Sequence, residues 1–323
     1  MILSAEKKHP LCRLALIILL CLLLSPSSVD AEKLYKFVDE NGHITFTDKP
    51  VGAGTLEKVA QVRKERPMQR FKVQNRGSKS GPVLYAVNGY FGPIEAEFTL
   101  KNLKNVSVKR HTRPRIVVPA VGEVRVITMS QISPRQGYSY YWATNSVFGD
   151  PDAQHKPNRP YLLPIPPDKQ FRLSQAFLGA ATHSGNVQSE YAVDIPMPVG
   201  TAIHAARSGV IMDVAGDFFE GGVSEEMMEQ ANYVCVLHDD GTMAIYAHLE
   251  LETVKFPIGK RIERGQVLAL SGNTGFSSGP HLHFAIQKNF GMELRSIPFE
   301  FEGNDGTSFT PEAGMMASRN SGN

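Results

Sequence analysis

Two histidines in the stretch SSGPHLHFAI, residues 277–286, have a type and spacing that can support chemistry. His281 and His283 flank one leucine in an apolar, strand-like run. Residues i and i+2 of a β-strand point to the same face, so both imidazoles would face one side and Leu282 the other. This geometry allows both rings to reach one metal ion. Two core histidines with separate hydrogen-bond partners would give the same pattern, so the pair alone does not decide.

Three other residues favour the metal site. Asp194 lies in the apolar run YAVDIPMP, where an unpaired carboxylate would be costly to bury. His248 ends the apolar run IYAHLE, and His183 lies in the turn-like segment ATHSG upstream of Asp194. A catalytic zinc site has three protein ligands with N, O or S atoms and keeps one position for water. A buried aspartate with several histidines near the ends of strands has the composition of such a site.

The elements that must position these residues are β-strands. The 323 residues include 28 glycines and 21 prolines, which favours many turns and therefore β structure over helical bundles. Residues 168–300 consist of short apolar runs joined by glycine-bearing turns, and we predict an antiparallel β-sheet domain there. Residues 81–165 contain runs that alternate apolar and polar side chains, which predicts a small β-sandwich. The predicted fold class is therefore mainly β.

The first 31 residues predict a secretory signal peptide. Basic residues up to Arg13 precede an apolar core of 11 residues, 14–24, and the small residues that end at Ala31 fit a cleavage site. The core is too short to span a bilayer comfortably. We therefore expect export, with no stable membrane span after the signal is removed; a retained membrane anchor is the alternative.

The cysteines agree with this interpretation. Cleavage would remove Cys12 and Cys21 and leave Cys235 alone in the mature chain, so no intramolecular disulfide would be possible. Cys235 lies in the alternating apolar run NYVCVLH. This position predicts a buried structural thiol with no catalytic part.

A β-hairpin module is expected directly after the signal, over residues 32–66. Two β-prone runs, 34–38 and 43–47, flank Asn41-Gly42, which is a strong short-range hairpin signal. The stretch resembles the small uncharacterised hairpin module that often follows a signal peptide in exported bacterial proteins. That resemblance implies no chemistry of its own.

The remaining segments are polar. Residues 67–80 predict a linker, and residues 301–323, rich in Gly, Ser, Asn and Asp, predict a disordered tail. The formal net charge of the whole chain is +2, and no block of Lys and Arg stands out. These values do not indicate a nucleic-acid binder.

Three stretches together carry a family resemblance. They are YAVDIPMPVGTAIHAARSGVI, IYAHLE and GKRIERGQVLALSGNTGFSSGPHLHFAI. In order, spacing and glycine positions they closely resemble the core of the lysostaphin-type (LytM-like) zinc metalloendopeptidases, over roughly residues 170–295. The resemblance implies an antiparallel sheet with an open groove, a Zn²⁺ cofactor, and hydrolysis of the stem peptides or cross-bridges of peptidoglycan. It also implies an exported enzyme, in the periplasm of a Gram-negative bacterium.

The family pattern also implies roles for individual residues. Asp194 and His283 match two zinc ligands. His281 and His248 match catalytic histidines that do not bind the metal. The two histidines of HLH are therefore expected to have different roles: His283 binds the metal, and His281 faces the substrate.

The first ligand departs from the family pattern. The family usually has a histidine four residues before the aspartate, and this chain has Glu190 there. The segment resembles a subgroup of the family that places this histidine further upstream, so we assign His183 as the ligand and keep Glu190 as the alternative. If neither binds, the zinc is lost. The protein would then be an inactive homologue that binds peptidoglycan or activates a cell-wall amidase.

Two further expectations complete the analysis. Ala285 stands where the family often has Glu or Gln after HLHF, and we expect this to alter a contact in the groove and not the metal. A non-enzymatic adhesin or scaffold is a third class of function. No stretch of residues 32–165 contains a ligand motif that would favour it.

Overall fold

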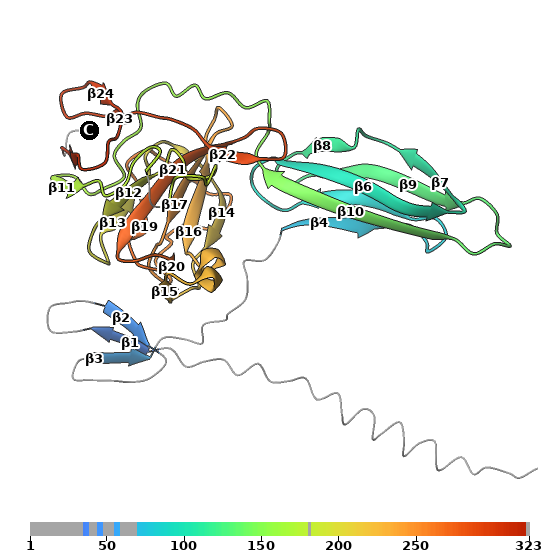
Figure 1. Ribbon diagram of the computed structural model, residues 1–323, viewed down its shortest axis with the longest axis horizontal. Coiled ribbons are helices and arrows are strands. Elements are labelled where there is room, and N and C mark those ends of the chain that lie inside the picture. Colours follow the sequence, from blue (N-terminus) through green and yellow to red (C-terminus); the bar gives the residue numbers. More distant parts are fainter. Residues whose placement is uncertain (1–34, 39–43, 48–54, 59–69, 180–181, 321–323) are drawn as a thin grey trace, which may run out of the picture.

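The computed structural model describes residues 35–38, 44–47, 55–58, 70–179 and 182–320 (Figure 1). The predicted signal peptide, residues 1–31, lies outside the described residues. Within the described part, nearly all regular structure is β-strand, with one short 3₁₀-helix at η1 (Glu225–Glu229). The mainly β fold class is confirmed. No helix among the described residues is long and apolar enough to cross a membrane.

The N-terminal module is a three-stranded sheet. β1 (Tyr35–Val38) pairs antiparallel with β2 (Ile44–Thr47), as the hairpin signal predicts. β3 (Thr55–Lys58), which the sequence did not predict, pairs with the other edge of β1. An isolated two-stranded hairpin is only marginally stable in water, so a third strand stabilises the module.

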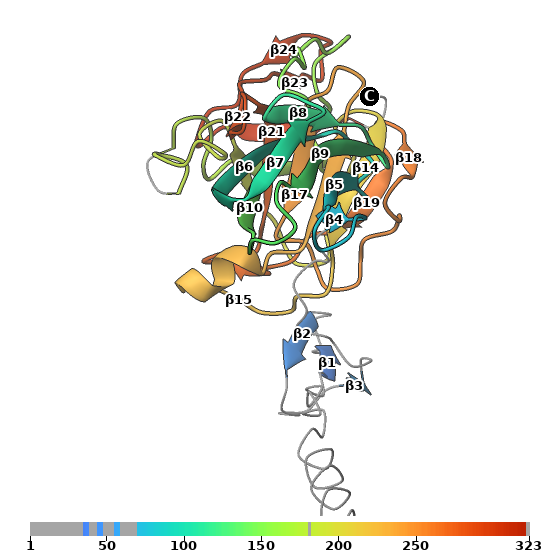
Figure 2. The same cartoon turned by 90° about the vertical axis from the view of Figure 1, so that its right-hand side faces the viewer.

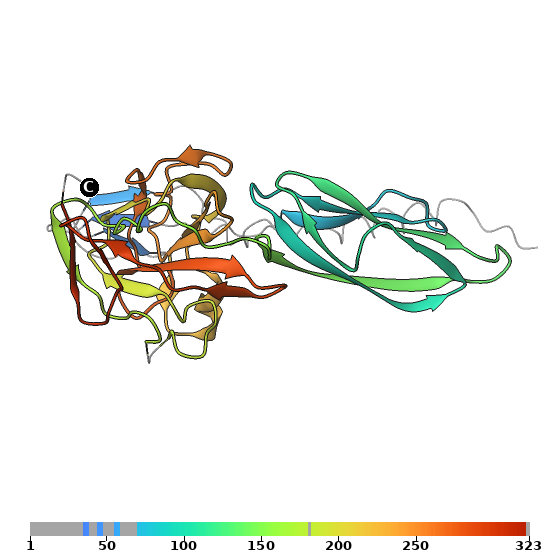
Figure 3. The ribbon, with the colours of Figure 1, turned by 90° about the horizontal axis from the view of Figure 1, so that it is seen from above.

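Residues 70–148 form the predicted β-sandwich. One sheet has the order β4-β5-β9-β7, and the other has the order β10-β6-β8. The strands are β4 (Phe71–Asn75), β5 (Val83–Asn88), β6 (Ile94–Lys104), β7 (Val106–Arg110), β8 (Arg115–Val118), β9 (Glu123–Gln131) and β10 (Ser139–Phe148). Figure 3 shows the two layers of strands from above. β4 lies inside the segment expected to be a linker, so the sandwich begins earlier than the sequence indicated.

Residues 150–320, called the C-terminal domain below, are built on one large antiparallel sheet. Its order is β12-β21-β17-β16-β14-β18, and β22 adds to β21. The strands are β12 (Val193–Pro196), β14 (Gly209–Ala215), β16 (Tyr233–Leu237), β17 (Met243–Ala247), β18 (Arg261–Ile262), β21 (His281–Asn289) and β22 (Leu294–Ser296).

Four two-stranded pairs surround this sheet. They are β11 (Lys169–Arg172) with β25 (Met316–Arg319), β13 (Ala202–His204) with β19 (Val267–Leu270), β15 (Gly221–Gly222) with β20 (Gly275–Phe276), and β23 (Phe301–Glu302) with β24 (Ser308–Phe309). Only the β15–β20 pair is parallel among them. Gly221 is required there, because a Cβ atom at that position would lie 1.7 Å from the carbonyl oxygen of Asn273.

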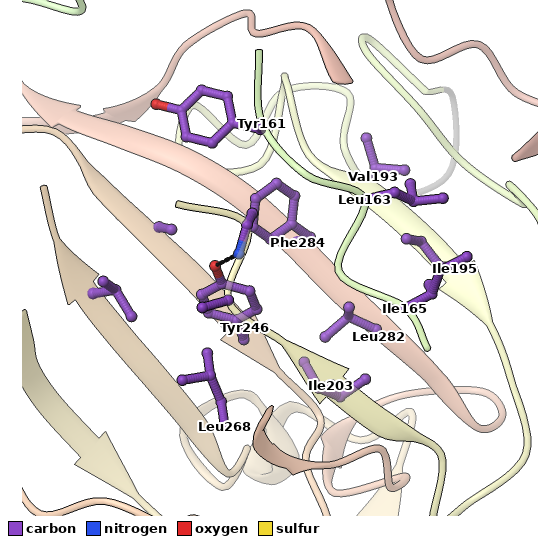
Figure 4. Close-up of a cluster of buried hydrophobic side chains, with 14 of the residues drawn as sticks. Tyr161, Leu163, Ile165, Val193, Ile195, Ile203, Tyr246, Leu268, Leu282 and Phe284 are labelled. Carbon is purple, nitrogen blue, oxygen red and sulfur yellow. Dashed lines mark hydrogen bonds between the residues drawn. The ribbon is translucent and has the colours of Figure 1, made fainter. Parts of the chain in front are cut away.

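One face of the large sheet packs on the main core of the domain. Leu282 and Phe284 of β21 and Tyr246 of β17 are fully buried there (Figure 4). The backbone N–H of Ala206 donates to the Tyr246 hydroxyl at 2.8 Å. Because side chains alternate along a strand, His281 and His283 lie on the opposite face. The predicted inward direction of Leu282 is confirmed.

The opposite face of the sheet meets the sandwich in a second core. Met212, Cys235 and Met243 of the sheet share this core with Ile94 of the sandwich. Figure 2 looks along the sandwich, with its strands in front of those of the large sheet. Cys235 is fully buried and free, which confirms the predicted structural thiol. The two domains are therefore packed together through apolar contacts.

A buried carboxylate adds a polar anchor at this junction. Glu95 of the sandwich is 4% exposed and accepts hydrogen bonds from the Asn289 side chain at 2.8 Å and the Met292 backbone at 2.6 Å. Removing the Asn289 side chain would leave the buried carboxylate with the Met292 N–H as its remaining donor here, which is costly.

The expected disordered tail is wrong for residues 301–320. β25 pairs with β11, and Phe301 and Ala317 are buried in the main core. Arg319 is 8% exposed and donates to the backbone carbonyl of Ile165 at 2.9 Å. The polar composition of the segment concealed a few apolar side chains, which are sufficient to dock it on the domain.

Candidate metal centre

Strand pairing brings Asp194 and His283 together. β12 and β21 are adjacent antiparallel strands, and Asp194 is the direct partner of His283 in their register. The Asp194 side chain is largely buried, and its Oδ1 lies 2.8 Å from Nδ1 of His283. The backbone of the sheet therefore holds a carboxylate and an imidazole side by side, although they are 89 residues apart in sequence.

A short loop places His183 next to Asp194. Its Nδ1 contacts the carbonyl oxygen of Ala176 at 3.1 Å, and since a carbonyl can only accept, Nδ1 carries the proton. Its Nε2 then faces Oδ2 of Asp194 at 3.2 Å. The chain turns back after His183 through Gly185, whose φ of +78° suits glycine, and Asn186 donates to the His183 carbonyl.

These three residues fit a divalent metal ion. Their ligand atoms all lie within 4.8 Å of one another, and they form the only such group of His, Cys, Asp or Glu that the described residues contain. Nε2 of His183 is buried and makes no hydrogen bond of acceptable geometry, a costly state that a bound cation would relieve. Two imidazoles and a carboxylate are donors that zinc accepts in a tetrahedral site.

Ligand spacing agrees with this fit. With metal–ligand bonds of about 2.0–2.1 Å, tetrahedral ligands are about 3.3 Å apart. The two contacts of the Asp194 carboxylate, with His283 at 2.8 Å and His183 at 3.2 Å, approach that separation. Glu190, the alternative ligand, belongs to no such group among the described residues. The geometry therefore favours His183.

His248 and His281 stand next to this group. Their ring centroids are 4.5 Å apart, and the His248 ring is 5.9 Å from that of His283. Nδ1 of His248 donates to the Thr274 carbonyl at 2.7 Å, and Nδ1 of His281 donates to the Gly279 carbonyl at 2.8 Å. Each contact fixes one tautomer and leaves Nε2 free of a proton in the neutral ring.

The backbone at His248 is in the left-handed region, with φ of +63°. This conformation is uncommon for a residue with a side chain and is often found at functional sites. The N–H of Gly272 donates to the His248 carbonyl at 2.9 Å and helps to hold the turn. The strand β17 ends one residue earlier, so the turn directs this imidazole away from the regular sheet.

Burial and charge shift the pKa values of these groups in different directions. Burial raises the pKa of Asp194, but its contacts with His183 and His283, and their positive charge when they are protonated, outweigh burial and hold the pKa well below its ordinary value. Burial lowers the pKa of His183, and the neighbouring Asp194 carboxylate outweighs it, so the pKa is raised. Burial, followed by repulsion from His281 and His283, lowers the pKa of His248 to about 3.

The sequence analysis missed Gln175, which holds two parts of the site. Its Nε2 donates to Oδ2 of Asp194 at 2.7 Å and to the Thr182 hydroxyl at 3.1 Å. Its backbone also pairs with Asp194, so the segment that carries it lies along the edge of β12. The sequence offers one general indication of such a residue: a buried carboxylate requires hydrogen-bond donors near it.

Ser277 has a similar place beside His281. It is 4% exposed, its hydroxyl donates to Asn273 Oδ1 at 2.8 Å, and it lies 3.2 Å from Nδ1 of His281. Ala285, in contrast, is fully buried and opposite Ile245 in the sheet. It offers no exposed surface of its own, and the altered groove contact stays a prediction.

Comparison with known proteins gives the class of this domain. Residues 188–293 match the model described as Peptidase family M23, and this part of the chain is a domain of that metallopeptidase family. The match contains Asp194, His248, His281 and His283 but begins after His183. Residues 19–76 match a domain of unknown function, DUF4124. The resemblance to lysostaphin-type enzymes and to an uncharacterised N-terminal module is confirmed.

Curated relatives are similar to part of this chain. The chain is 32% identical over 123 residues to the peptidoglycan DD-endopeptidase ShyA of Vibrio cholerae, covering 38% of this chain and 26% of the relative. It is 34% identical over 118 residues to the glycyl-glycine endopeptidase ALE-1 of Staphylococcus capitis, covering 36% and 30%. The chain thus spans less than a third of the length of either relative.

Solved structures include similar chains. The catalytic domain of lysostaphin from Staphylococcus simulans is 23% identical, with 44% of this chain and 88% of that chain covered and a TM-score of 0.27.

Proposed function

We propose that the protein is an exported, zinc-dependent endopeptidase that hydrolyses the peptide cross-links of peptidoglycan. The observation that carries the proposal is the convergence of His183, Asp194 and His283, with two more histidines beside them, on one face of an M23 sheet. Relatives named as peptidoglycan DD-endopeptidase and glycyl-glycine endopeptidase support the substrate class.

In this proposal His183, Asp194 and His283 hold the zinc. A zinc ion in such a site lowers the pKa of its water to about 7 and polarises a carbonyl group. Asp194 is ionised throughout the neutral range, because its pKa is held low, and Gln175 keeps one of its oxygens oriented. The Ala176 carbonyl holds the His183 proton on Nδ1, so that Nε2 is available as a ligand.

His248 and His281 are proposed as the catalytic pair. Burial lowers the pKa of His248 to about 3, so its ring is neutral at physiological pH, and its Nε2 can accept a hydrogen bond, and in the transition state a proton, from the attacking water. His281 lies on the same side, and once its Nε2 has taken up a proton it can donate a hydrogen bond to the substrate as negative charge develops on the carbonyl oxygen. Their Nδ1 contacts with Thr274 and Gly279 keep both rings oriented without tying them to the metal.

An inactive homologue that binds peptidoglycan or activates an amidase is the alternative. Loss of a ligand would favour it, and the departure at Glu190 was the one reason to consider it. The position of His183 beside Asp194 and His283 supports it as the replacement ligand, and no observation favours this alternative. Periplasmic location is proposed from the signal-like N-terminus and from relatives that act on bacterial cell walls.

The test measures zinc content and the release of soluble muropeptides from purified peptidoglycan. We compare the wild type with His183→Ala and Glu190→Ala. The proposal expects His183→Ala to lose both zinc and activity, and Glu190→Ala to keep both. Zinc retained in His183→Ala but lost in Glu190→Ala would overturn the ligand assignment. A wild type that binds zinc and releases nothing would support the inactive alternative.

A further inference from the structure

The nearly neutral chain contains two domains of opposite charge. Residues 70–148 contain twelve Lys and Arg, three Glu and no Asp, a formal net charge of +9. Residues 150–320 contain twelve Lys and Arg and 21 Asp and Glu, a formal net charge of −9. The total charge of +2 and the absence of a Lys/Arg block therefore conceal a strongly basic sandwich.

All three carboxylates of the sandwich are already engaged. Glu123 forms an ion pair with Arg76 at 2.6 Å, and Glu97 forms one with Arg115 at 3.2 Å. Glu95 is buried at the junction with the C-terminal domain, as described above. No acidic side chain of the sandwich is left to neutralise its other cations.

Three of those cations share the outer surface of the sheet β4-β5-β9-β7. Lys72, Lys109 and Arg125, called the basic face below, are all exposed, and none has an ion-pair partner within 4.0 Å among the described residues. The alternate positions Leu84 and Ala86 on β5 are fully buried between the sheets. The side chains of the basic face therefore point to solvent.

Strand register places the three cations across this surface. Arg125 is opposite Tyr85, and Lys109 is opposite Thr128, while Lys72 is opposite Val87. Nε2 of His111 lies 2.8 Å from the Thr128 hydroxyl. Burial, followed by the charges of Arg125 and Lys109, lowers the pKa of His111, which indicates that both cations act on the same region.

The position of the basic face suits a repeating anion. Side chains on one face of a sheet recur roughly every 7 Å along a strand and every 5 Å across strands, so the charges are spread over a surface and do not converge on one pocket. The shared apolar core holds the sandwich on the C-terminal domain. The basic face and the metal centre therefore belong to one packed unit.

We propose that the basic face binds the carboxylates of peptidoglycan stem peptides and holds the polymer on the enzyme. The inference rests on the proposed function, which makes peptidoglycan the substrate. Since the C-terminal domain carries a net charge of −9, it repels an anionic polymer, and the sandwich supplies the attraction. Contact at two places makes the second contact effectively intramolecular.

Peptidoglycan fits this face better than a lipid surface does. Stable attachment to lipid combines cations with inserted apolar side chains. The exposed large hydrophobic side chains of the sandwich include Leu103, Ile132 and Tyr141, and none of them belongs to the basic face. Val83, Tyr85 and Val87, which share the face, are only partly exposed.

The test uses the full chain and insoluble peptidoglycan. The variant Lys72→Gln/Lys109→Gln/Arg125→Gln removes the basic face. Lys169→Gln/Lys255→Gln/Lys260→Gln removes three exposed cations from the C-terminal domain as a matched control. Cosedimentation is measured at several salt concentrations, and hydrolysis is measured on peptidoglycan and on a soluble cross-linked peptide. Thermal unfolding of each variant checks that it folds.

We expect the basic-face variant to bind peptidoglycan at least about tenfold more weakly at low salt, with a smaller loss at high salt where charges are screened. Its hydrolysis of insoluble peptidoglycan should fall in parallel, while hydrolysis of the soluble peptide changes less than about twofold. The control variant should behave as the wild type. The charge-preserving variant Lys72→Arg/Lys109→Arg/Arg125→Lys should retain binding.

Other outcomes overturn the inference. If the basic-face variant binds peptidoglycan as tightly as the wild type, the inference is wrong, even when both proteins hydrolyse peptidoglycan. Preferential binding of the wild type to phosphatidylglycerol vesicles would identify a lipid surface instead. Charge-dependent self-association in sedimentation would identify a second copy of the chain. In a further outcome, the wild type binds peptidoglycan through the basic face and yet hydrolyses neither substrate. That result would contradict the proposed function and leave the binding inference intact.

Discussion

Two groups of histidines on the same side of the large sheet differ in their relation to one carboxylate. In the ligand group, His183 and His283 contact Asp194 at 3.2 and 2.8 Å. In the neighbouring pair, His281 is 3.8 Å from the same carboxylate, and His248 is held instead by a backbone carbonyl. The pKa is raised at His183 and lowered to about 3 at His248.

The proposed roles would give one residue type two functions within a small space. A carboxylate attracts positive charge, either a proton or a metal ion, to the imidazoles that contact it. A backbone carbonyl fixes only the tautomer, and burial then keeps the ring neutral. The comparison predicts that the two groups respond differently to mutation and to pH.

The largest expected effect separates catalysis from metal binding. His248→Ala should lower the rate of peptidoglycan hydrolysis by about 10²- to 10⁴-fold, because a positioned proton-transfer group is lost. Zinc content, measured on the same sample, should remain that of the wild type. His204→Ala is the matched control, since His204 is also buried and its Nδ1 contacts a carbonyl, that of Gly265. Loss of zinc from His248→Ala would contradict the division between the groups.

A smaller effect is expected at Gln175, which orients the ligand group without belonging to it. Gln175→Ala removes the donors to Asp194 and Thr182 and should weaken zinc binding by about 10- to 100-fold. Competition with a chelator measures the affinity, and the spectrum of the cobalt-substituted protein reports the ligand geometry. Gln266→Ala, in an exposed turn, is the control. An unchanged affinity in Gln175→Ala would show that the loop holds His183 without this bridge.

The smallest effect is a pH dependence of zinc binding. The raised pKa of His183 means that the metal-free pair with Asp194 contributes stability at low pH, which is lost as the pH rises through that pKa. Zinc must displace this proton, so its affinity should rise by about tenfold per pH unit from pH 5 to the raised pKa. His248→Gln should keep the same slope, because a group with a pKa of about 3 carries no proton in this range. A flat profile in the wild type would contradict the coupling.

Much of the fold was predictable because its signals are local. Asn41-Gly42 predicted the hairpin of β1 and β2, and alternating side chains predicted the sandwich and the inward direction of Leu282. The failures concern segments whose partners are far away in sequence. β4 and the docked tail are polar and short, and only contact with β5, β11 and the main core makes them regular structure.

In the candidate site, too, the local features were predictable from the sequence and the long-range contacts were not. HLH predicts that His281 and His283 share a face, because the period of a strand is a local property. Asp194 joins them only through the pairing of β12 with β21. The choice between His183 and Glu190 depends on a loop whose path is held by the Ala176 carbonyl and by Gln175. No local pattern encodes those contacts.

The sequence by itself therefore determined the donor types, the strand period, the turn signals and the class of chemistry, since each is a property of residues close together in the chain. The tertiary structure alone decided which third residue joins Asp194 and His283. It also decided that three of the twelve cations in residues 70–148 lie together on one open face of the sandwich. Both outcomes depend on distances between segments far apart in sequence, which only the packing of the sheets specifies.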